Sequence, residues 1–382
     1  MGAIACATAL TTVAACSSSG AGSSAASGSG GGPGDSSALV AHAKAAIAKN
    51  TAQPAFKAPG RSINVGTLRG TTVLVVAHDQ VADELVGIAQ GIQQAGAAAG
   101  VNVKVYNGNA SVSTIQQGFT QGIQQHVGAI IIDGIDTKLI TSSIAAAKGA
   151  GIPVVAVENS TPDPNSPGQG AGEGIYANAE PPNYLFGQLI ADKAIADSGG
   201  QVNAAILTFN NPIAAAAVEG MHAELSQCSG CKVVATATIE PANWPTQVAT
   251  QTESIAKSNP SMNYVLTAAD TMGIFAVSGV KLAAKSSSVH VLGVDGSGPA
   301  TLALTKDSSV MQADPGSSPT WLGWAALDQS LRAMLKSPAA DPTVPYRWID
   351  KNQLANANPK DLTTVYGDSY VAGYKALWGL NG

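Results

Sequence analysis

The chain has 382 residues, with 20 basic and 25 acidic side chains and a net charge of -5. This length suits two domains better than one, and the charged fraction of 12% is about half of the usual share. The mildly acidic composition excludes the basic surface that nucleic-acid binding requires, and a hydrophobic share of 45% is typical of a compact globular protein.

The N-terminal segment predicts export. Residues 1–16 read MGAIACATALTTVAAC, an apolar stretch too short to cross a bilayer, so a signal peptide is the better interpretation. Its end, Val-Ala-Ala-Cys, resembles the lipobox of bacterial lipoproteins, which implies cleavage before Cys16 and lipidation of that cysteine. The alternative is an Ala-rich leader without such a role. Residues 17–61 are interpreted as a flexible tether and lead-in, because 17–37 hold mostly small residues; helical spacing begins at Leu39.

From Thr72 the chain alternates between short apolar runs and helical periodicity. We expect strands at 72–77, 101–106, 129–132 and 154–157, with helices at 85–99, 116–126 and 139–148 between them. Such strand-helix-strand units make the strands parallel and the crossovers right-handed. The pattern predicts an α/β fold with a parallel, helix-covered sheet, whose ligands bind beyond the carboxyl ends of the strands.

A Pro- and Gly-rich stretch at 161–174 interrupts this alternation, as a domain linker or a loop would. The alternation then resumes, with helices at 184–197, 213–226, 245–257 and 273–284 and strands at 204–208, 233–238, 264–267 and 290–294. Two α/β halves of similar size imply a duplicated architecture. The space between two such halves is the natural ligand site.

Four segments carry a resemblance to a known family. They read GIAQGIQQAGAAAGVNVKVYNG, AGIPVVAVENS, LTAADTMGIFAVSGVK and VLGVDGSGP, and in order and spacing they resemble the type I periplasmic binding proteins, especially the sugar-binding subfamily of ABC importers. The resemblance covers 62 to about 335. It implies two Rossmann-like lobes with parallel sheets, joined by a three-segment hinge. The expected N-terminal lobe is 62–159 plus 315–337, and the expected C-terminal lobe is 160–314 plus 339–382.

The resemblance also implies the positions of the ligand contacts. The family's first-lobe aromatic residues match Ala82, Glu84 and Leu85 here, and its gripping arginines are absent. The expected ligand-binding residues are His78, Asp79, Gln80, Glu158, Asn159, Trp244, Asp270, Asp295, Asp314 and Trp321.

Several of these positions have a structural alternative. Trp244 and Trp321 also fit core packing, Asp270 also fits a helix N-cap, and His78 also fits a loop histidine with a local partner. Two acids after the third predicted strand, Asp133 and Asp136, also fit an exposed loop.

The polar set favours a neutral polyhydroxylated or a cationic ligand, because an anionic ligand would require the missing arginines. The expected function is therefore that of a membrane-tethered lipoprotein that captures a small polar solute for an ABC permease, and the resemblance implies that this solute is a sugar or polyol. The alternative is a co-receptor that presents the solute to a membrane signalling protein. A related repressor family would need an N-terminal DNA-binding motif, which the leader replaces. We expect a monomer, no nucleic-acid partner and no metal or other cofactor.

No catalytic or nucleotide-binding motif stands at a strand-to-helix turn, so we expect a binding protein and not an enzyme. Cys228 and Cys231 form a C-x-x-C motif between a predicted helix and a predicted strand. In an exported protein this motif favours a local disulfide. Zinc would require further ligands, and a thioredoxin-like motif should open a helix.

Overall fold

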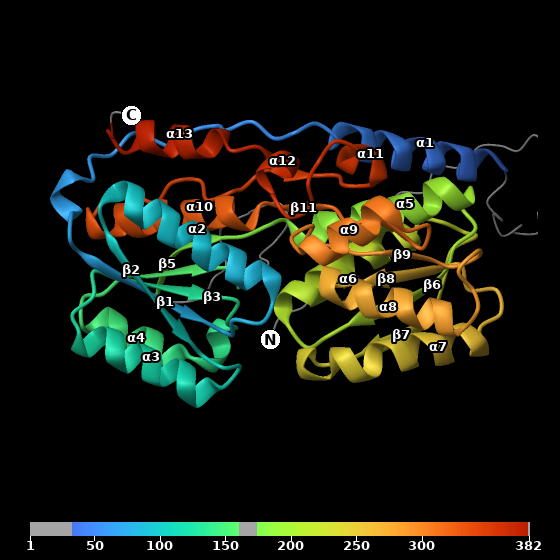
Figure 1. The fold of residues 1–382 in the computed structure, drawn as a ribbon, viewed down its shortest axis with the longest axis horizontal. Coiled ribbons are helices and arrows are strands. Elements are labelled where there is room, and N and C mark those ends of the chain that lie inside the picture. The colour runs from blue at the N-terminus through green and yellow to red at the C-terminus, as the bar shows by residue number, and fades with distance from the viewer. Residues whose placement is uncertain (1–32, 160–173, 381–382) are drawn as a thin grey trace, which may run out of the picture.

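The computed structural model describes residues 33–159 and 174–380, which form two α/β lobes side by side (Figure 1). The first lobe contains a parallel sheet of order β2-β1-β3-β4-β5. Its strands are β1 (Thr72–Ala77), β2 (Asn102–Asn107), β3 (Ala129–Asp133), β4 (Val154–Val157) and β5 (Ile175–Ala179). One face carries α2 (Asp83–Ala99) and α10 (Pro319–Met334), and the other carries α3 (Val112–Gln124) and α4 (Thr141–Gly149).

The second lobe repeats this plan with a parallel sheet of order β10-β9-β8-β6-β7. The strands are β6 (Asn203–Thr208), β7 (Lys232–Thr238), β8 (Tyr264–Thr267), β9 (His290–Leu292) and β10 (Met311–Ala313). Helices α5 (Asn183–Ser198) and α6 (Pro212–Leu225) cover one face, and α7 (Ala249–Ser258) and α8 (Asp270–Leu282) cover the other. Helix α9 (Pro299–Asp307) connects β9 to β10. The expected α/β fold with two parallel sheets is confirmed.

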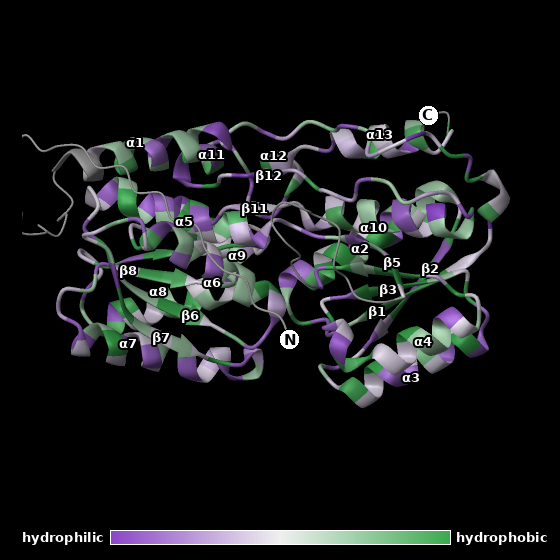
Figure 2. Ribbon diagram, turned by 180° about the vertical axis from the view of Figure 1, so that it is seen from behind, coloured by the Kyte–Doolittle hydropathy of each residue, from purple (hydrophilic) through white to green (hydrophobic). Residues whose placement is uncertain are grey.

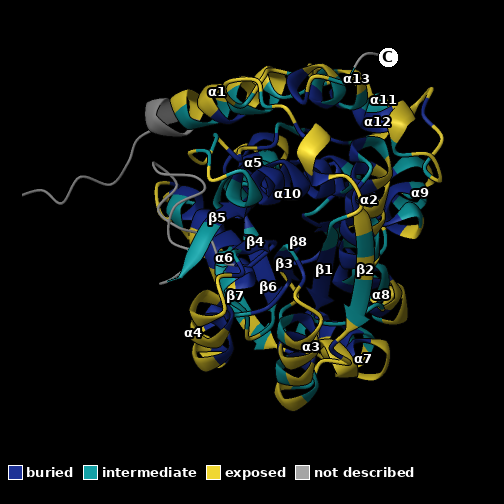
Figure 3. Ribbon diagram, turned by 90° about the vertical axis from the view of Figure 1, so that its left-hand side faces the viewer, coloured by how far each residue is buried: buried dark blue, intermediate teal, exposed yellow. Residues whose placement is uncertain are grey.

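Apolar runs form these strands because both faces of each sheet are covered. In β1, Val73 and Val75 pack under α2 and α10, whereas Leu74 and Val76 pack over α3 and α4. A strand buried on both sides needs apolar residues at every position, which explains the continuous runs. The central strands of both lobes are buried, the edge strands β2 and β7 are partly exposed, and α3, α4 and α7 expose their outer turns (Figure 3). Figure 2 shows the same division, with apolar strands and mixed helices.

The first lobe is larger than the sequence predicts. Strand β5 pairs in parallel with β4, so residues 175–179 belong to the first sheet, although we expected the second lobe to begin at 160. Pairing with β5 covers an edge of β4 that would otherwise be open. The chain enters the second lobe only after Ala179, at 180–182.

The C-terminal tail is divided between the lobes, which corrects its expected assignment to the second lobe alone. The short helix α11 (Lys351–Leu354) packs against α9, near α12 (Thr363–Tyr366), and β12 (Tyr346–Arg347) pairs with β11 (Gly316–Ser317). Helix α13 (Ser369–Leu377) instead lies on α10 of the first lobe (Figure 1). The buried Asp328 carboxylate anchors this end, because it accepts hydrogen bonds from the indole of Trp378 and from Arg332, each at 2.8 Å.

The expected tether also contains an ordered helix. Helix α1 (Pro33–Lys49) packs against α5, and its Ala43 is fully buried in the core of the second lobe. The segment that follows returns to the first lobe, where Phe56 contacts Tyr374 at 5.0 Å between ring centroids. Leu39, Val40 and Ile47 supply the apolar stripe of α1. The expected signal peptide, the Cys16 lipidation site and residues 17–32 lie outside the described residues.

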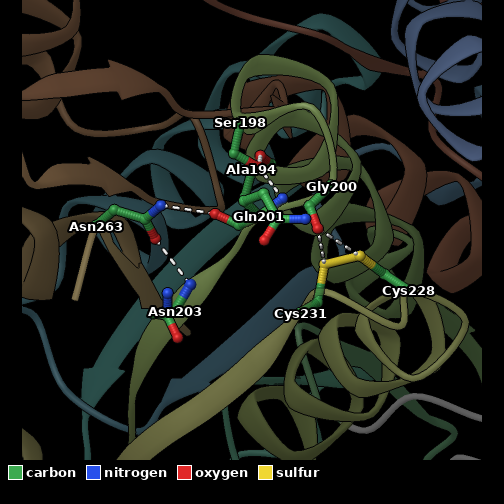
Figure 4. Close-up of a disulfide and its surroundings, with 8 residues drawn as sticks. All are labelled: Ala194, Ser198, Gly200, Gln201, Asn203, Cys228, Cys231 and Asn263. Carbon is green, nitrogen blue, oxygen red and sulfur yellow. Dashed lines mark hydrogen bonds between the residues drawn. A yellow bond between two sulfur atoms is a disulfide. The ribbon is translucent and has the colours of Figure 1, made fainter. Parts of the chain in front are cut away.

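The remaining short elements complete the connections. Single helical turns lie at Gly66–Leu68, Thr137–Leu139, Pro241–Asn243 and Trp244–Val248. Cys228 and Cys231, between α6 and β7, form a disulfide with a Cα–Cα distance of 5.2 Å, and both sulfur atoms lie near the carbonyl oxygen of Gly200 (Figure 4). No helix in the described ranges has the length and apolar character needed to cross a membrane.

Glycines set the close approach of paired helices in each lobe. A Cβ on Gly187 of α5 would lie 1.9 Å from the carbonyl oxygen of Ala217 in α6, and a Cβ on Gly91 of α2 would lie 2.3 Å from that of Thr320 in α10. No side chain larger than hydrogen fits at these distances. We therefore expect Gly187→Ala to lower the free energy of unfolding by about 1–3 kcal/mol or more, as overpacking does.

The matched control is Gly149→Ala, at the exposed end of α4, where an added Cβ meets no atom within 4 Å. It should be neutral or should stabilise by about 0.5–1 kcal/mol, because alanine favours the helix. Urea unfolding followed by circular dichroism measures both changes. Equal effects of the two substitutions would contradict the close packing of α5 on α6.

Candidate functional site

The carboxyl ends of the two sheets face each other, and the polar residues that follow their strands meet between the lobes. The contact is direct at the N-termini of α2 and α9: a Cβ on Gly298 would lie 2.9 Å from Asp270 Oδ2 and 3.3 Å from Asp83 Oδ2. We call this region the interlobe site. It is defined by six carboxylates from β3, β4, α2, α8 and the segments after β9 and β10: Glu84, Asp133, Glu158, Asp270, Asp295 and Asp314.

Asp133 ends β3 and is fully buried, which rules out the exposed-loop interpretation. Neither of its carboxylate oxygens has a hydrogen-bond partner among the described residues. Burial raises the pKa of Asp133 well above its usual value, and the nearby Glu158 and Asp79 raise it further.

Glu158 and Asn159 follow β4, as expected. Glu158 has a positive φ of 50°, and burial together with Glu180 raises its pKa to about 8. The backbone N–H of Asn159 donates to Glu180 Oε1 at 3.2 Å. The side chain of Asn159 is fully buried, and within the described chain neither its oxygen nor its nitrogen has a partner.

Asp270 organises the turn before α9. Its Oδ2 accepts hydrogen bonds from the backbone N–H of Gly298 at 2.7 Å, and from the N–H and O–H of Ser297 at 3.3 and 3.0 Å. It is the first residue of α8, and no side chain caps that helix. The alternative role of Asp270 as an N-cap is therefore replaced by a bridge between α8 and α9.

Asp295 and Asp314 occupy the second-lobe side of the site. Asp295 has a φ of 101°, and its Oδ2 accepts the N–H of Asp270 at 3.4 Å. Asp314 is fully buried at the crossover 314–318, where its N–H donates to the carbonyl oxygen of Ile349 at 2.9 Å. Burial, followed by neighbouring carboxylates, raises the pKa of both groups well above its usual value.

The loop after β1 holds His78, Asp79 and Gln80 together. His78 Nδ1 lies 2.8 Å from Asp79 Oδ2, and Asp79 Oδ1 accepts the N–H groups of Val81 and Ala82 at 2.7 and 3.2 Å. The hydrogen bond with His78 lowers the pKa of Asp79. The side chain of Gln80 donates to the Asp79 carbonyl oxygen. The local-partner interpretation of His78 thus has direct support, and the oxygens of Asp79 are already occupied.

Both expected tryptophans lie in hydrophobic cores. The indole N–H of Trp244 donates to the Ile239 carbonyl oxygen at 2.8 Å, and its ring meets Phe209 edge-on at 5.3 Å. Trp321 is 2% exposed and stacks on Tyr370 at 4.8 Å. This packing, with a partner from the C-terminal tail, supports the core alternative for Trp321.

Sequence reasoning missed three contributors. Glu84 lies in the first turn of α2, at a position where the resemblance implies an aromatic residue. Ser297 bonds Asp270, and Tyr366, from the tail, donates its O–H to the Gly296 carbonyl oxygen at 2.8 Å. Burial raises the pKa of Tyr366 well above its usual value, and Asp314 contributes next. For Asp133, the sequence signal that could have indicated burial is its position directly after the apolar run AIII.

The interlobe carboxylates face one another without a basic partner. In the ranges 33–159 and 174–380 the ion pairs are His78–Asp79, Lys193–Asp197, Lys257–Glu253 and Arg332–Asp328, and none includes the six carboxylates. The same ranges contain no group of three or more His, Cys, Asp or Glu arranged to hold a metal ion. The site is therefore suited to hydrogen bonding with a solute that brings donors.

Two α/β lobes whose facing sheet ends carry convergent polar groups define a two-lobed binding protein. A family model described as a periplasmic binding protein domain matches residues 74–336, well over half of the chain. The chain belongs to this family of periplasmic binding proteins, which act outside the cytoplasm and bind their substrates without transforming them.

Individual relatives carry sugar or polyol names. The chain is 27% identical over 212 residues to a D-apiose import binding protein from Actinobacillus succinogenes. The aligned region covers 55% of this chain and 64% of that relative. The chain thus spans less than two thirds of the relative's length.

Solved structures share the fold. A solute-binding protein from Actinobacillus succinogenes with bound D-allose has a TM-score of 0.65 at 22% identity and covers 75% of this chain and 100% of its own. A solute-binding protein from Bacillus halodurans with bound myo-inositol has a TM-score of 0.67 at 16% identity and covers 78% of this chain and 100% of its own. These likenesses show the fold alone.

The raised pKa values predict how stability depends on pH. For a carboxyl group whose pKa is higher in the folded chain, the folded state binds more protons between the two values, so stability falls as pH rises through that window. For Glu158 the window runs from 4.5 to about 8. The melting temperature of the ligand-free protein should therefore be lower at pH 8 than at pH 5.5, by roughly 2–4 °C for each 1 kcal/mol lost.

Glu158→Gln should reduce this slope, whereas Glu219→Gln, at an exposed position of α6, should leave it unchanged. Differential scanning calorimetry across pH 5–8 provides the measurement. A slope that is the same in the wild type and in Glu158→Gln would show that Glu158 does not titrate in this environment.

Proposed function

We propose that this chain is a membrane-tethered solute-binding lipoprotein of an ABC importer, which captures a sugar or polyol between its two lobes. The observation that carries the proposal is a pair of fully buried side chains at the facing sheet ends, Asp133 and Asn159, whose polar atoms have no partner among the described residues. Buried polar groups without partners are costly, so their presence favours a solute whose hydroxyl groups complete the hydrogen bonds.

The chemistry of the site supports this class of solute. Carboxylates accept hydrogen bonds from hydroxyl groups, and an amide can both donate and accept. The relatives named above bind D-apiose, D-allose or myo-inositol, all of them small and polyhydroxylated. The import role of the first relative favours transport over the co-receptor alternative.

The two-lobed architecture supports capture by closure. Three crossovers connect the lobes, which agrees in number with the three-segment hinge that the resemblance implies: 180–182, 314–318 and 335–345. Asp314 lies in the second of them. The segments after α1 and before α13 add two further passages. A solute that contacts both lobes favours the closed arrangement, because only that arrangement offers all of its partners.

A solute screen tests the proposal. Differential scanning fluorimetry with D-apiose, D-allose, myo-inositol, further pentoses and hexitols, nucleosides and amino acids should give a rise in melting temperature for a member of the sugar or polyol group, since a ligand that binds only the folded state stabilises it. Asn159→Ala and Asp295→Asn should weaken binding of the best solute about 10- to 100-fold, as loss of a buried hydrogen bond of about 1–3 kcal/mol predicts.

Asp307→Asn, at the exposed end of α9, serves as the control and should leave the dissociation constant unchanged in isothermal titration calorimetry. Silence across all sugars and polyols would overturn the solute class. Unchanged affinity in both Asn159→Ala and Asp295→Asn would move the binding site elsewhere.

The membrane tether has its own test. Cys16→Ser should abolish lipidation and release the protein from the membrane fraction, because a single residue carries the anchor in the lipobox interpretation. The matched control is Cys6→Ser, which should leave the membrane association intact. Metabolic labelling with a fatty acid, followed by fractionation, measures both. Equal labelling of the Cys16→Ser variant and the wild type would refute the anchor.

A further inference from the structure

We infer that the solute carries a positive charge, so that the interlobe site recognises an amine-bearing sugar or polyol. The inference rests on the proposed function and adds the charge of the solute to it. Its basis is a cluster of carboxylates without a basic partner in the described residues, together with two buried side chains for which the same residues supply no partner.

Charge is contributed by both lobes. Glu84, Asp133 and Glu158 belong to the first lobe, and Asp270 and Asp295 belong to the second. Asp314 stands at a crossover. No Lys or Arg pairs with any of them in the described ranges, and the sequence of 160–173 contains neither residue type.

The second observation concerns partners and not charge. Asp133 has two buried oxygens without a donor, and Asn159 has a buried amide without a donor or an acceptor among the described residues. A single carboxylate in such a place needs donors and, if ionised, a counter-charge. An ammonium group provides three N–H donors and one positive charge, whereas a neutral hydroxyl provides a single donor. The hydroxyl groups of the same solute can bond the Asn159 amide.

While the solute is absent, burial and mutual repulsion favour the protonated forms of these carboxyl groups. Burial first, and neighbouring carboxylates next, raise the pKa of Glu84, Asp133 and Asp295, and the pKa of Glu158 reaches about 8. A bound cation favours the ionised carboxylates and displaces these protons. The other titratable groups that face the site are Asp83, Glu180, Tyr366 and the His78–Asp79 pair.

Matched solutes that differ only in one group test the inference on the full chain. The pairs are D-glucitol with 1-amino-1-deoxy-D-glucitol and scyllo-inositol with its amine analogue scyllo-inosamine, and putrescine is an amine without hydroxyl groups. Isothermal titration calorimetry at pH 6, 7 and 8, in buffers of different ionisation enthalpy, should show at least tenfold tighter binding of an amine member. It should also show proton release on binding and an affinity that increases with pH.

Variants separate charge from shape. Asp133→Asn keeps the size of the side chain and removes its charge, so it should weaken binding of the amine member at least tenfold more than it weakens binding of the hydroxyl partner. Glu158→Gln provides the same comparison at a second position, should Asp133→Asn fail to fold. Asp307→Asn is the control and should change neither.

The outcomes distinguish the two proposals. Equal or tighter binding of the hydroxyl members would overturn the inference and leave the sugar or polyol function intact. Preference for putrescine over every hydroxylated solute would overturn that function and retain the positive charge. Silence of all five compounds, combined with binding of a neutral sugar in the wider screen, would overturn the inference alone; silence in both screens would overturn both proposals.

Discussion

The structure depends on one electrostatic constraint: carboxylates from two lobes are buried against each other, and the part of the chain that the structure describes places no basic side chain in an ion pair with them. Desolvation and mutual repulsion both oppose the ionised forms, which is why the pKa values of Asp133, Asp295 and Asp314 are all raised. The arrangement is tolerated only when protons or a solute neutralise it. Asp328, by contrast, has Arg332 and Trp378 as partners and serves the fold.

The alternation of strands and helices was predictable because both sheets are covered on two faces and therefore need continuous apolar runs. Strand β5 was not, since IYANA is short, contains Asn178 and follows a Pro- and Gly-rich stretch. The placement of α1 and α13 also escaped prediction, because it depends on contacts far along the chain. An apolar stripe predicts that a helix packs, but it does not say against which lobe.

The same limit applied to the site. The resemblance implied Glu158, Asn159 and Asp295 as contacts, and all three follow strands, whose carboxyl ends meet at one edge of a parallel sheet. The resemblance could not show whether Trp321 packs in the core or contacts a ligand. Its stacking partner Tyr370 belongs to the C-terminal tail, which lies outside the resemblance. Tyr366 was missed for the same reason. Glu84 stands at a position where the resemblance implies an aromatic residue, so the sequence analysis noted only the missing ring. Its carboxyl group lies where the lobes meet.

The charge of the site also bears on how closure depends on the solute. The contact of Gly298 with Asp83 and Asp270 shows that the first turns of α2 and α9 meet when the lobes are together. Closure therefore brings first-lobe carboxylates toward those of the second lobe, and repulsion opposes it while the carboxylates are ionised. A cation between them converts this repulsion into attraction, and it does so only in the closed arrangement. A ligand shifts a conformational equilibrium by its difference in affinity for the two states, and here the charges of both lobes enlarge that difference. Protonation of the carboxylates also removes the repulsion that opposes closure, so low pH and a cationic solute should favour the same closed state.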